Sequence, residues 1–218
     1  CLSGGPIKID YVLATFDNPK AYSALSTAYP AAEYVGAVAN QNHHADGVVD
    51  LVIIIPTSNK LYTQAKRLGD MHASHDGMTY RIVPANELYN EFSSGTPDVS
   101  AYRRYLKMFY DQNSDGGVKN VLLMGDCVWD NRMKTLSGNS ADDYLLVYET
   151  YNSYDKTKAI PIDHFITILQ DEMTVHADGK SQNSMQMDCG VGRIPVTTDA
   201  EAKYVFDKII DYVEKSPY

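Results

Sequence analysis

Five consecutive aliphatic residues, Leu51–Ile55, end directly at Pro56 and form the longest apolar run in the chain. A strand with one face in water alternates apolar and polar residues, so an unbroken run predicts a strand that is buried on both faces. Such strands belong to parallel sheets that carry helices on both sides, and the run therefore favours an α/β fold. The run is also far shorter than the roughly 20 residues that cross a bilayer, so we expect no transmembrane segment.

Segments with helical and extended patterns alternate after this run, as they do in βαβ units. Short apolar runs over residues 80–83 and 121–124 predict two more strands. Apolar residues at helical spacing predict helices over residues 58–75, 97–111 and 199–215. The expected fold is therefore a parallel sheet flanked by helices.

Capping residues mark the ends of these predicted helices. We expect Ser58 to cap the first helix and Gly77 to close it, and Thr96 to cap the second. Thr198 and Glu201 have the spacing of a capping box at the start of the third.

Residues 1–48 show no sustained period, and we expect them to be the tail of a preceding region or a linker. Residues 49–218 then form the α/β domain. Within it, residues 143–148 and 160–169 look extended, and residues 171–188 are polar and loop-like.

The charge of the chain argues against one broad class of partner. Lys and Arg number 19 against 28 Asp and Glu, giving a net charge of −9 that repels phosphate backbones, so no nucleic-acid partner is expected. The three cysteines, Cys1, Cys127 and Cys189, have no metal-ligand spacing and indicate neither a disulfide framework nor a zinc site. Because no leader sequence precedes Cys1, we expect a mature or truncated start. A dinucleotide fingerprint is absent from the sequence.

The segment after residues 121–124 is where the sequence predicts chemistry. Ligands of parallel sheets bind beyond the carboxyl ends of the strands, and Gly125, Asp126 and Cys127 occupy such an end. Cys127 is a nucleophile if one of the six histidines lies beside it, and a small half-buried thiol if none does. No nucleophile elbow or paired histidine motif decides between these interpretations.

Acidic residues recur through the second half of the chain. They include Asp126, Asp142, Asp143, Asp163, Asp171, Glu172 and Asp188. Carboxylate oxygens are ligands that Ca²⁺ prefers, so a group of these residues that converges would bind calcium. The same residues equally form a solvated acidic surface, and their spacing leaves both interpretations open.

His72 and His75 lie three residues apart on a predicted helix, next to Asp76. This spacing places two imidazoles within reach of one metal ion. It equally describes a polar helix end, where histidines interact favourably with carbonyl dipoles. His43 and His44 are weaker metal candidates, because adjacent residues in an extended segment point to opposite sides.

Several phrases of the sequence resemble the gingipain-like cysteine peptidases and follow in the family's order. They are Asn40-Gln41-Asn42-His43-His44, Asp50-Leu51-Val52-Ile53-Ile54-Ile55-Pro56, Gln64-Ala65-Lys66-Arg67-Leu68, Asn90-Glu91-Phe92-Ser93-Ser94-Gly95-Thr96-Pro97-Asp98 and Ala101-Tyr102-Arg103-Arg104. The most specific phrase is Val-Leu-Leu-Met-Gly-Asp-Cys-Val-Trp-Asp-Asn-Arg-Met over residues 121–133, followed by Gly-Val-Gly-Arg-Ile-Pro-Val over residues 190–196. The resemblance covers about residues 40–215.

The resemblance implies a caspase-like catalytic domain made of two parallel α/β subdomains, with the catalytic histidine and cysteine in the second. The family's Gly-His-Gly motif does not occur in this sequence, and Cys127 does not match the family nucleophile. The chain is therefore expected to be the first, non-catalytic subdomain of a larger cysteine endopeptidase, with the second subdomain as its partner. The implied parent is a sortase of a type IX secretion system that processes secreted proteins at the cell surface or outer membrane.

Calcium is the one cofactor that the resemblance implies. In the family, the aspartate of the Gly-Asp phrase and an acidic residue before the Gly-Arg strand contribute to bound calcium. Asp126 and Asp188 match these two positions, and Asp171 is a further candidate ligand. Asp163 is the one residue here that matches a further acidic phrase of the family. We therefore expect Asp126 and Asp188 to approach each other at the carboxyl edge of the sheet.

A stand-alone acidic α/β module for binding or scaffolding, without peptidase activity, is the alternative function. Nothing within the residues themselves separates it from the peptidase subdomain, because one fold hosts many functions.

Overall fold

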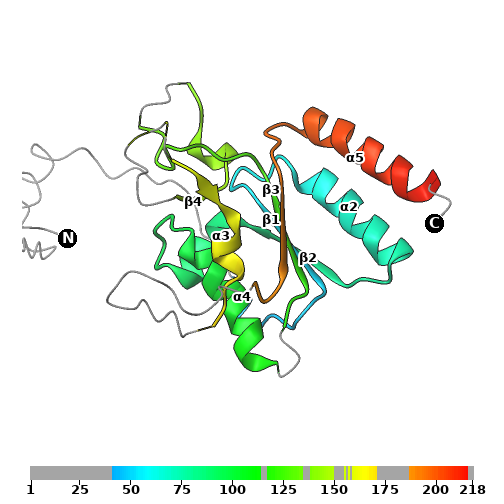
Figure 1. Ribbon diagram of the computed structural model, residues 1–218, viewed down its shortest axis with the longest axis horizontal. Coiled ribbons are helices and arrows are strands. Elements are labelled where there is room, and N and C mark those ends of the chain that lie inside the picture. Colours follow the sequence, from blue (N-terminus) through cyan, green and yellow to red (C-terminus); the bar gives the residue numbers. More distant parts are fainter. Residues whose placement is uncertain are drawn as a thin grey trace, which may run out of the picture. The chain divides into compact units, whose positions relative to one another are not determined.

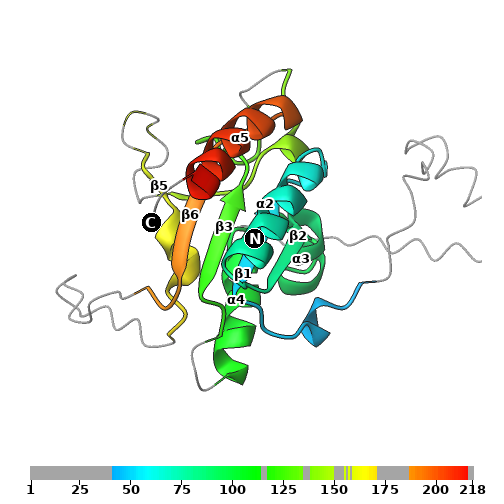
Figure 2. The ribbon, with the colours of Figure 1, turned by 90° about the vertical axis from the view of Figure 1, so that its right-hand side faces the viewer.

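The strand β1 (Leu51–Ile55) lies inside a four-stranded parallel sheet, as its apolar run predicted. The strand order is β2-β1-β3-β6, with β2 at Tyr80–Pro84, β3 at Asn120–Met124 and β6 at Gly190–Ile194. Ile53 of β1 is in register with Ile82 of β2 and Leu122 of β3. Figure 2 shows the four strands side by side in this order.

The computed structural model describes residues 41–113, 117–134, 138–149, 155, 157, 159–170 and 187–215. Three predictions therefore concern residues outside the described ones: the tail over residues 1–40, the start at Cys1, and the loop that contains Asp171 and Glu172.

Two layers of helices cover the sheet, one on each face (Figure 1). The first layer contains α2 (Tyr62–His75) and α5 (Asp199–Lys215), and the second contains α3 (Ala85–Phe92) and α4 (Ser100–Gln112). Successive residues of β1 point to opposite faces, so Ile53 packs in the α2–α5 layer and Ile54 in the α3–α4 layer. The predicted parallel α/β fold with helices on both faces is confirmed.

Short elements complete the described chain. They are the 3-10 helices η1 (His43–Ala45), η2 (Ala141–Asp143) and η3 (Asp163–Thr167), and the antiparallel pair β4 (Tyr148–Glu149) and β5 (Pro161–Ile162). The prediction that residues 160–169 are extended was therefore wrong over η3.

The predicted starts of α2 and α4 were four and three residues too early, because turns precede both helices. Asn59 has a positive φ of 58°, and its amide donates to the carbonyl of Pro56, so the predicted cap Ser58 lies in a turn. Before α4, the carboxylate of Asp98 accepts from the amide of Ser100 at 2.8 Å, the capping contact that had been assigned to Thr96.

The capping box of α5 and the end of α2 were predicted correctly. The Glu201 amide donates to the Thr198 hydroxyl at 3.3 Å, and the Thr198 amide donates to the Glu201 carboxylate at 3.2 Å. Gly77 follows α2 with a φ of +68°, the left-handed conformation that glycine adopts without strain.

The helix α3 was not predicted from the sequence. It begins at Ala85, directly after β2, with Pro84 at its N-cap. Its buried residues Ala85, Leu88 and Phe92 recur at helical spacing, and this pattern could have predicted the helix. The segment is short and has no polar N-cap residue that would have marked its start.

Residues 41–48 belong with the sheet rather than with the preceding tail, which corrects the predicted boundary at residue 49. One compact unit runs from Gln41 to Tyr218. The Gln41 side-chain amide donates to the carboxylate of Glu91 and to the carbonyl of Glu87, at 2.7 Å each. Within the described ranges, none of the helices has the length and apolar character needed to span a bilayer.

Truncation of the central strand tests this packing. Ile53 is completely buried, so Ile53→Ala is expected to lower the free energy of unfolding by ~2–5 kcal/mol through lost transfer energy and a residual cavity. The matched control is Ile160→Ala, because Ile160 is 60% exposed, and its cost is expected to stay within about 0.5 kcal/mol. Urea unfolding followed by circular dichroism measures both; equal losses would contradict the buried position of β1.

Candidate functional site

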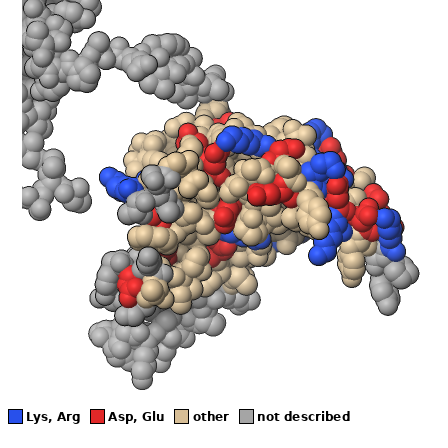
Figure 3. Space-filling model, turned by 90° about the horizontal axis from the view of Figure 1, so that it is seen from above, with Lys and Arg blue, Asp and Glu red and all other residues tan. Residues whose placement is uncertain are grey.

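The carboxyl ends of the strands meet at one edge of the sheet, which Figure 3 shows from outside with acidic and basic side chains interspersed. The amide of Gly125 donates to the carbonyl of Ile194, and that of Asp126 to the carbonyl of Val196, so the ladder between β3 and β6 continues beyond β3. A Cβ atom on Gly125 would lie 2.9 Å from side-chain atoms of Leu145 and Pro56. Glycine is therefore required where this edge is most tightly packed.

A buried arginine organises this edge. Arg193 of β6 has a side chain only 10% exposed and forms a two-point ion pair with Asp163, with Nε–Oδ2 at 2.9 Å and Nη2–Oδ1 at 2.7 Å. It also donates to the carbonyls of Gly125 at 2.9 Å and Leu146 at 3.4 Å. Burial lowers the pKa of Arg193, but the hydrogen bond and charge of Asp163 outweigh burial and raise it, so the guanidinium stays charged.

Residues 145–147 cross this edge in a fixed conformation, because side chains and loop groups take up their backbone polar atoms. The amide of Leu145 donates to the carbonyl of Asp126 at 2.9 Å. The amide of Leu146 donates to the hydroxyl of Tyr102 at 3.4 Å. The Asn131 side-chain amide donates to the carbonyl of Val147 at 2.8 Å and accepts from its backbone amide at 3.1 Å. With the bond from Arg193, the segment is anchored at each of its three residues.

A cleft of about 760 Å³ opens beside residues 145–147, beyond the carboxyl end of β1. This volume lies within the usual range of small-molecule and peptide sites, and the place is where the chain reverses direction across the sheet, between β1 and β3. Its walls are formed by Thr57, residues Asn86, Tyr89 and Asn90 of α3, the loop 95–99, Asn131 with Arg132, and Ala141, Asp142, Tyr144, Leu146 and Val147.

Cys127 lies at the predicted strand end but lacks the features of a nucleophile. Burial raises the pKa of its thiol; Arg193 opposes this, while Asp163, Asp126 and Glu149 add to it. Across the described residues, no histidine hydrogen-bonds to Cys127. A protonated thiol without a base is a poor nucleophile. The structure therefore favours the interpretation of Cys127 as a small half-buried thiol.

Asp126 and Asp188 do not approach each other, which corrects the sequence prediction. β3 and β6 are parallel; Asp126 follows β3, whereas Asp188 precedes β6, so the two carboxylates lie at opposite edges of the sheet. Five-residue strands separate the edges by ~16 Å, too far to share one ion. Asp188 instead accepts from the amide of Leu169 at 2.7 Å and from the side chain of Gln170 at 3.2 Å.

Two other acidic candidates, Asp143 and Asp163, are each paired with a basic side chain. Lys60 lies 2.8 Å from Asp143 and lowers its pKa, and Asp163 is held by Arg193. In the part of the chain that the structure describes, no three His, Cys, Asp or Glu side chains form a metal-binding group. A shared Asp126–Asp188 calcium site does not fit this geometry; calcium bound with Asp171 stays a prediction on residues outside the described ranges.

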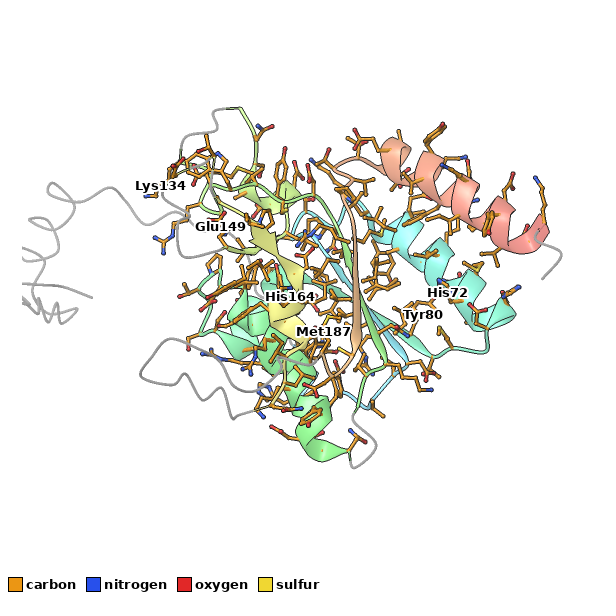
Figure 4. All side chains as sticks on the ribbon, viewed as in Figure 1. His72, Tyr80, Lys134, Glu149, His164 and Met187 are labelled. Carbon is orange, nitrogen blue, oxygen red and sulfur yellow. The ribbon has the colours of Figure 1, made fainter. Side chains whose placement is uncertain are left out.

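The histidine candidates for a metal are dispersed. Both His72 and His75 direct Nδ1 at Asp76, at 2.6 Å each, which matches the polar helix end. Figure 4 places His72 on the α2 side of the sheet and His164 on the opposite side. His43 lies in η1 rather than in an extended segment, and it and His44 both contact α3.

Sequence reasoning identified the edge through Gly125 and Asp126 but missed the residues that organise it, above all Arg193 and Asn131. The one readable signal for Arg193 is a charged residue inside a predicted strand, which has to find a buried partner. Asn131 offers no such signal, because its partner is a backbone segment 16 residues away.

Removing the partner of Arg193 tests the buried ion pair. Asp163→Ala leaves a buried cation without its counter-charge and is expected to lower the free energy of unfolding by ~3–5 kcal/mol. Asp207→Ala is the matched control, because the Arg67–Asp207 pair is 40% and 44% exposed, and its cost is expected to be about 0–1 kcal/mol. Urea unfolding at pH 7 measures the loss of unfolding free energy in both variants. If Asp163→Ala loses no more than Asp207→Ala, the Arg193–Asp163 pair is effectively solvated.

The thiol of Cys127 offers a second test. Because its pKa is raised above the ordinary value of 9.0, alkylation by iodoacetamide is expected to be slower than that of glutathione at pH 7 and to rise only above pH 9. Mass spectrometry of the Cys127 peptide measures the rate, with Cys127→Ala to confirm the assignment. An inflection below pH 8 would instead reveal an activated thiolate.

Comparison with known proteins adds independent information about this fold and its edge. The family model "Peptidase family C25" matches residues 44–218. Among solved structures, that of dimeric latent PorU from Porphyromonas gingivalis is similar, with a TM-score of 0.68 and 33% sequence identity. The match covers 83% of this chain but only 17% of the PorU chain, so this chain spans a small part of that relative's length. A search of curated proteins gave no match. Since the family model covers most of the sequence and the fold agrees with PorU, the chain belongs to peptidase family C25, the gingipain-like cysteine peptidases.

Proposed function

We propose that this chain is the first, non-catalytic α/β subdomain of a gingipain-like cysteine endopeptidase. The observation that carries the proposal is the family match over residues 44–218, in which the one described cysteine at a strand's carboxyl end has no histidine bonded to it. Nucleophilic catalysis by cysteine needs a thiolate and a base within hydrogen-bond reach. In this proposal, the dyad comes from a second subdomain of the same parent protein.

The second subdomain is the first partner of this chain in the proposal. In the described sheet, β6 pairs with β3 on one side only, and its residues are partly exposed. Unpaired strand edges in native proteins are covered by other elements, which supports β6 as the side where the partner packs. α5, the helix that follows β6, also carries two tyrosines that are 76% and 74% exposed, Tyr204 and Tyr212.

The role of the parent follows from the likeness to PorU. We assign to it the processing of secreted proteins at the cell surface: cleavage near a C-terminal sorting signal and transfer of the new carboxyl end to a surface acceptor. The cleft beside residues 145–147 supports a binding contribution from this subdomain, because it is pre-formed at the edge where ligands of parallel sheets bind.

Peptidase assays with the isolated chain and its longer gene product test the proposal. The 218-residue chain is expected to cleave no peptide, because no histidine among the described residues hydrogen-bonds to Cys127 and burial raises the pKa of its thiol. The longer product is expected to show thiol-dependent cleavage of a protein that carries a C-terminal sorting domain. The control is Cys127→Ala in both proteins, which is expected to leave the activity of the longer product unchanged.

Two outcomes would contradict the proposal. Turnover by the isolated chain that disappears in Cys127→Ala would make Cys127 a nucleophile. A reading frame that lacks a Gly-His-Gly motif and a later cysteine beyond residue 218 would favour the alternative, a stand-alone binding or scaffolding module.

A further inference from the structure

Residues 41–46, which we call the latch segment, attach to α3 through a histidine between two carboxylates. Nδ1 of His43 lies 2.8 Å from Asp46 Oδ2, and Nε2 lies 2.7 Å from Glu87 Oε2, with the histidine side chain 14% exposed. A neutral imidazole has one N–H and one lone pair, whereas the imidazolium has two N–H donors. Only the protonated ring therefore donates to both carboxylates; the neutral ring turns a lone pair toward one of them.

Charged or titratable groups from three other elements surround this histidine. Arg81 of β2 forms an ion pair with Asp46, and the hydroxyl of Tyr105 of α4 donates to the same carboxylate at 2.7 Å. From α3, Glu91 accepts the amide of His43 at 2.9 Å. With Asp46, Glu87 and Glu91 against Arg81 alone, the surroundings carry excess negative charge that favours a protonated His43.

Glu91 holds the rest of the latch segment. Besides the His43 amide, it accepts the amide of His44 at 3.2 Å, the His44 ring at 2.8 Å and the Gln41 side chain at 2.7 Å. Burial raises the pKa of Glu91, but these hydrogen bonds outweigh burial and lower it to about 2. Phe92 adds a stacking contact with the His44 ring, at a centroid distance of 4.5 Å.

A neighbouring face of α3 forms a wall of the cleft. Glu87 and Glu91 are four residues apart and share the face that holds the latch segment. Asn86 and Asn90, also four residues apart, line the cleft. The eight-residue helix is therefore held by the latch segment on one face while it bounds the cleft with another.

We propose that the latch segment is closed on α3 while His43 is protonated and opens as His43 loses its proton, so that the anchoring of one wall of the cleft responds to pH.

The direction of the pH dependence follows from linkage. Burial lowers the pKa of His43, but the hydrogen bonds and charges of Asp46 and Glu87 outweigh burial and raise it above 6.5. The stabilisation is therefore complete below pH 6.5 and is lost as the pH rises through the raised value. Between those two values, the ratio of closed to open segment falls by up to ~10-fold per pH unit. Glu91 limits the closed state at the acid end, because its contribution is lost as the pH falls from 4.5 toward 2.

Hydrogen exchange on the whole 218-residue chain tests the proposal. Protection factors, corrected for the intrinsic rate at each pH, are measured at pH 6 and pH 9 for the amides of His43 and His44, which donate to Glu91, and for residues 85–92 of α3. The amides of the latch segment and of α3 are both expected to have lower protection factors at pH 9 than at pH 6. The protection factors of the β1 amides are expected to stay unchanged. The NMR titration of the His43 ring is expected to have a midpoint above 6.5 that coincides with this loss.

Two variants and a control make the outcome decisive. His43→Gln is expected to show low, pH-independent protection of the latch segment, and His72→Gln, which removes another aspartate-paired histidine on α2, is expected to behave like the parent chain. If His43→Gln does not fold, Glu87→Gln is expected to move the midpoint to lower pH by removing one carboxylate. Equal protection at pH 6 and pH 9, loss of the pH dependence in His72→Gln, or an unmoved midpoint in Glu87→Gln would overturn the proposal. None of these outcomes depends on peptidase activity, so the latch and the proposed function fail separately.

Discussion

The buried guanidinium of Arg193 is the interaction on which the carboxyl edge of this sheet depends. A cation that is 10% exposed is costly unless charge and hydrogen bonds offset its desolvation, and Asp163 supplies the charge while the carbonyls of Gly125 and Leu146 accept further N–H groups. These acceptors belong to segments that follow β3, cross the edge and lead into η3. One side chain of β6 therefore fixes three connections that have no shared secondary structure, and one of them borders the cleft through Leu146 and Val147.

The same arrangement decides which chemistry this edge supports. Two of its acidic residues are each paired with a cation, Asp163 with Arg193 and Asp143 with Lys60, and no three metal-ligating side chains come together in the described part of the chain. The thiol of Cys127 lies among carboxylates whose charge adds to the effect of burial and keeps it protonated. In the described part of the chain, this edge therefore supplies no activated thiolate at Cys127.

Local patterns predicted the elements whose causes are local. The apolar run Leu51–Ile55 predicted the central strand, and Thr198 with Glu201 predicted the start of α5, because a strand buried on both faces and a capping box are each written within a few residues. The starts of α2 and α4 were misplaced because turns precede both helices, and the predicted caps Ser58 and Thr96 lie in those turns. Asp126 and Asp188 were misplaced for a different reason: in parallel strands, a residue before one strand and a residue after its neighbour lie at opposite edges. The pairing of Arg193 with Asp163, 30 residues apart, leaves no local pattern at all.

Two cations hold the two sides of the cleft, and their chemistry differs. Arg193 anchors residues 145–147, and a guanidinium paired with a carboxylate keeps its charge at every pH at which the protein is folded. His43 helps to anchor α3 on the opposite side, and imidazole is the side chain whose charge changes near neutral pH. One wall is consequently fixed by a permanent charge and the other by a titratable one. A cleft built in this way changes through its α3 wall alone, so a ligand that contacts α3 would be bound with a pH dependence that a ligand confined to residues 145–147 would not share.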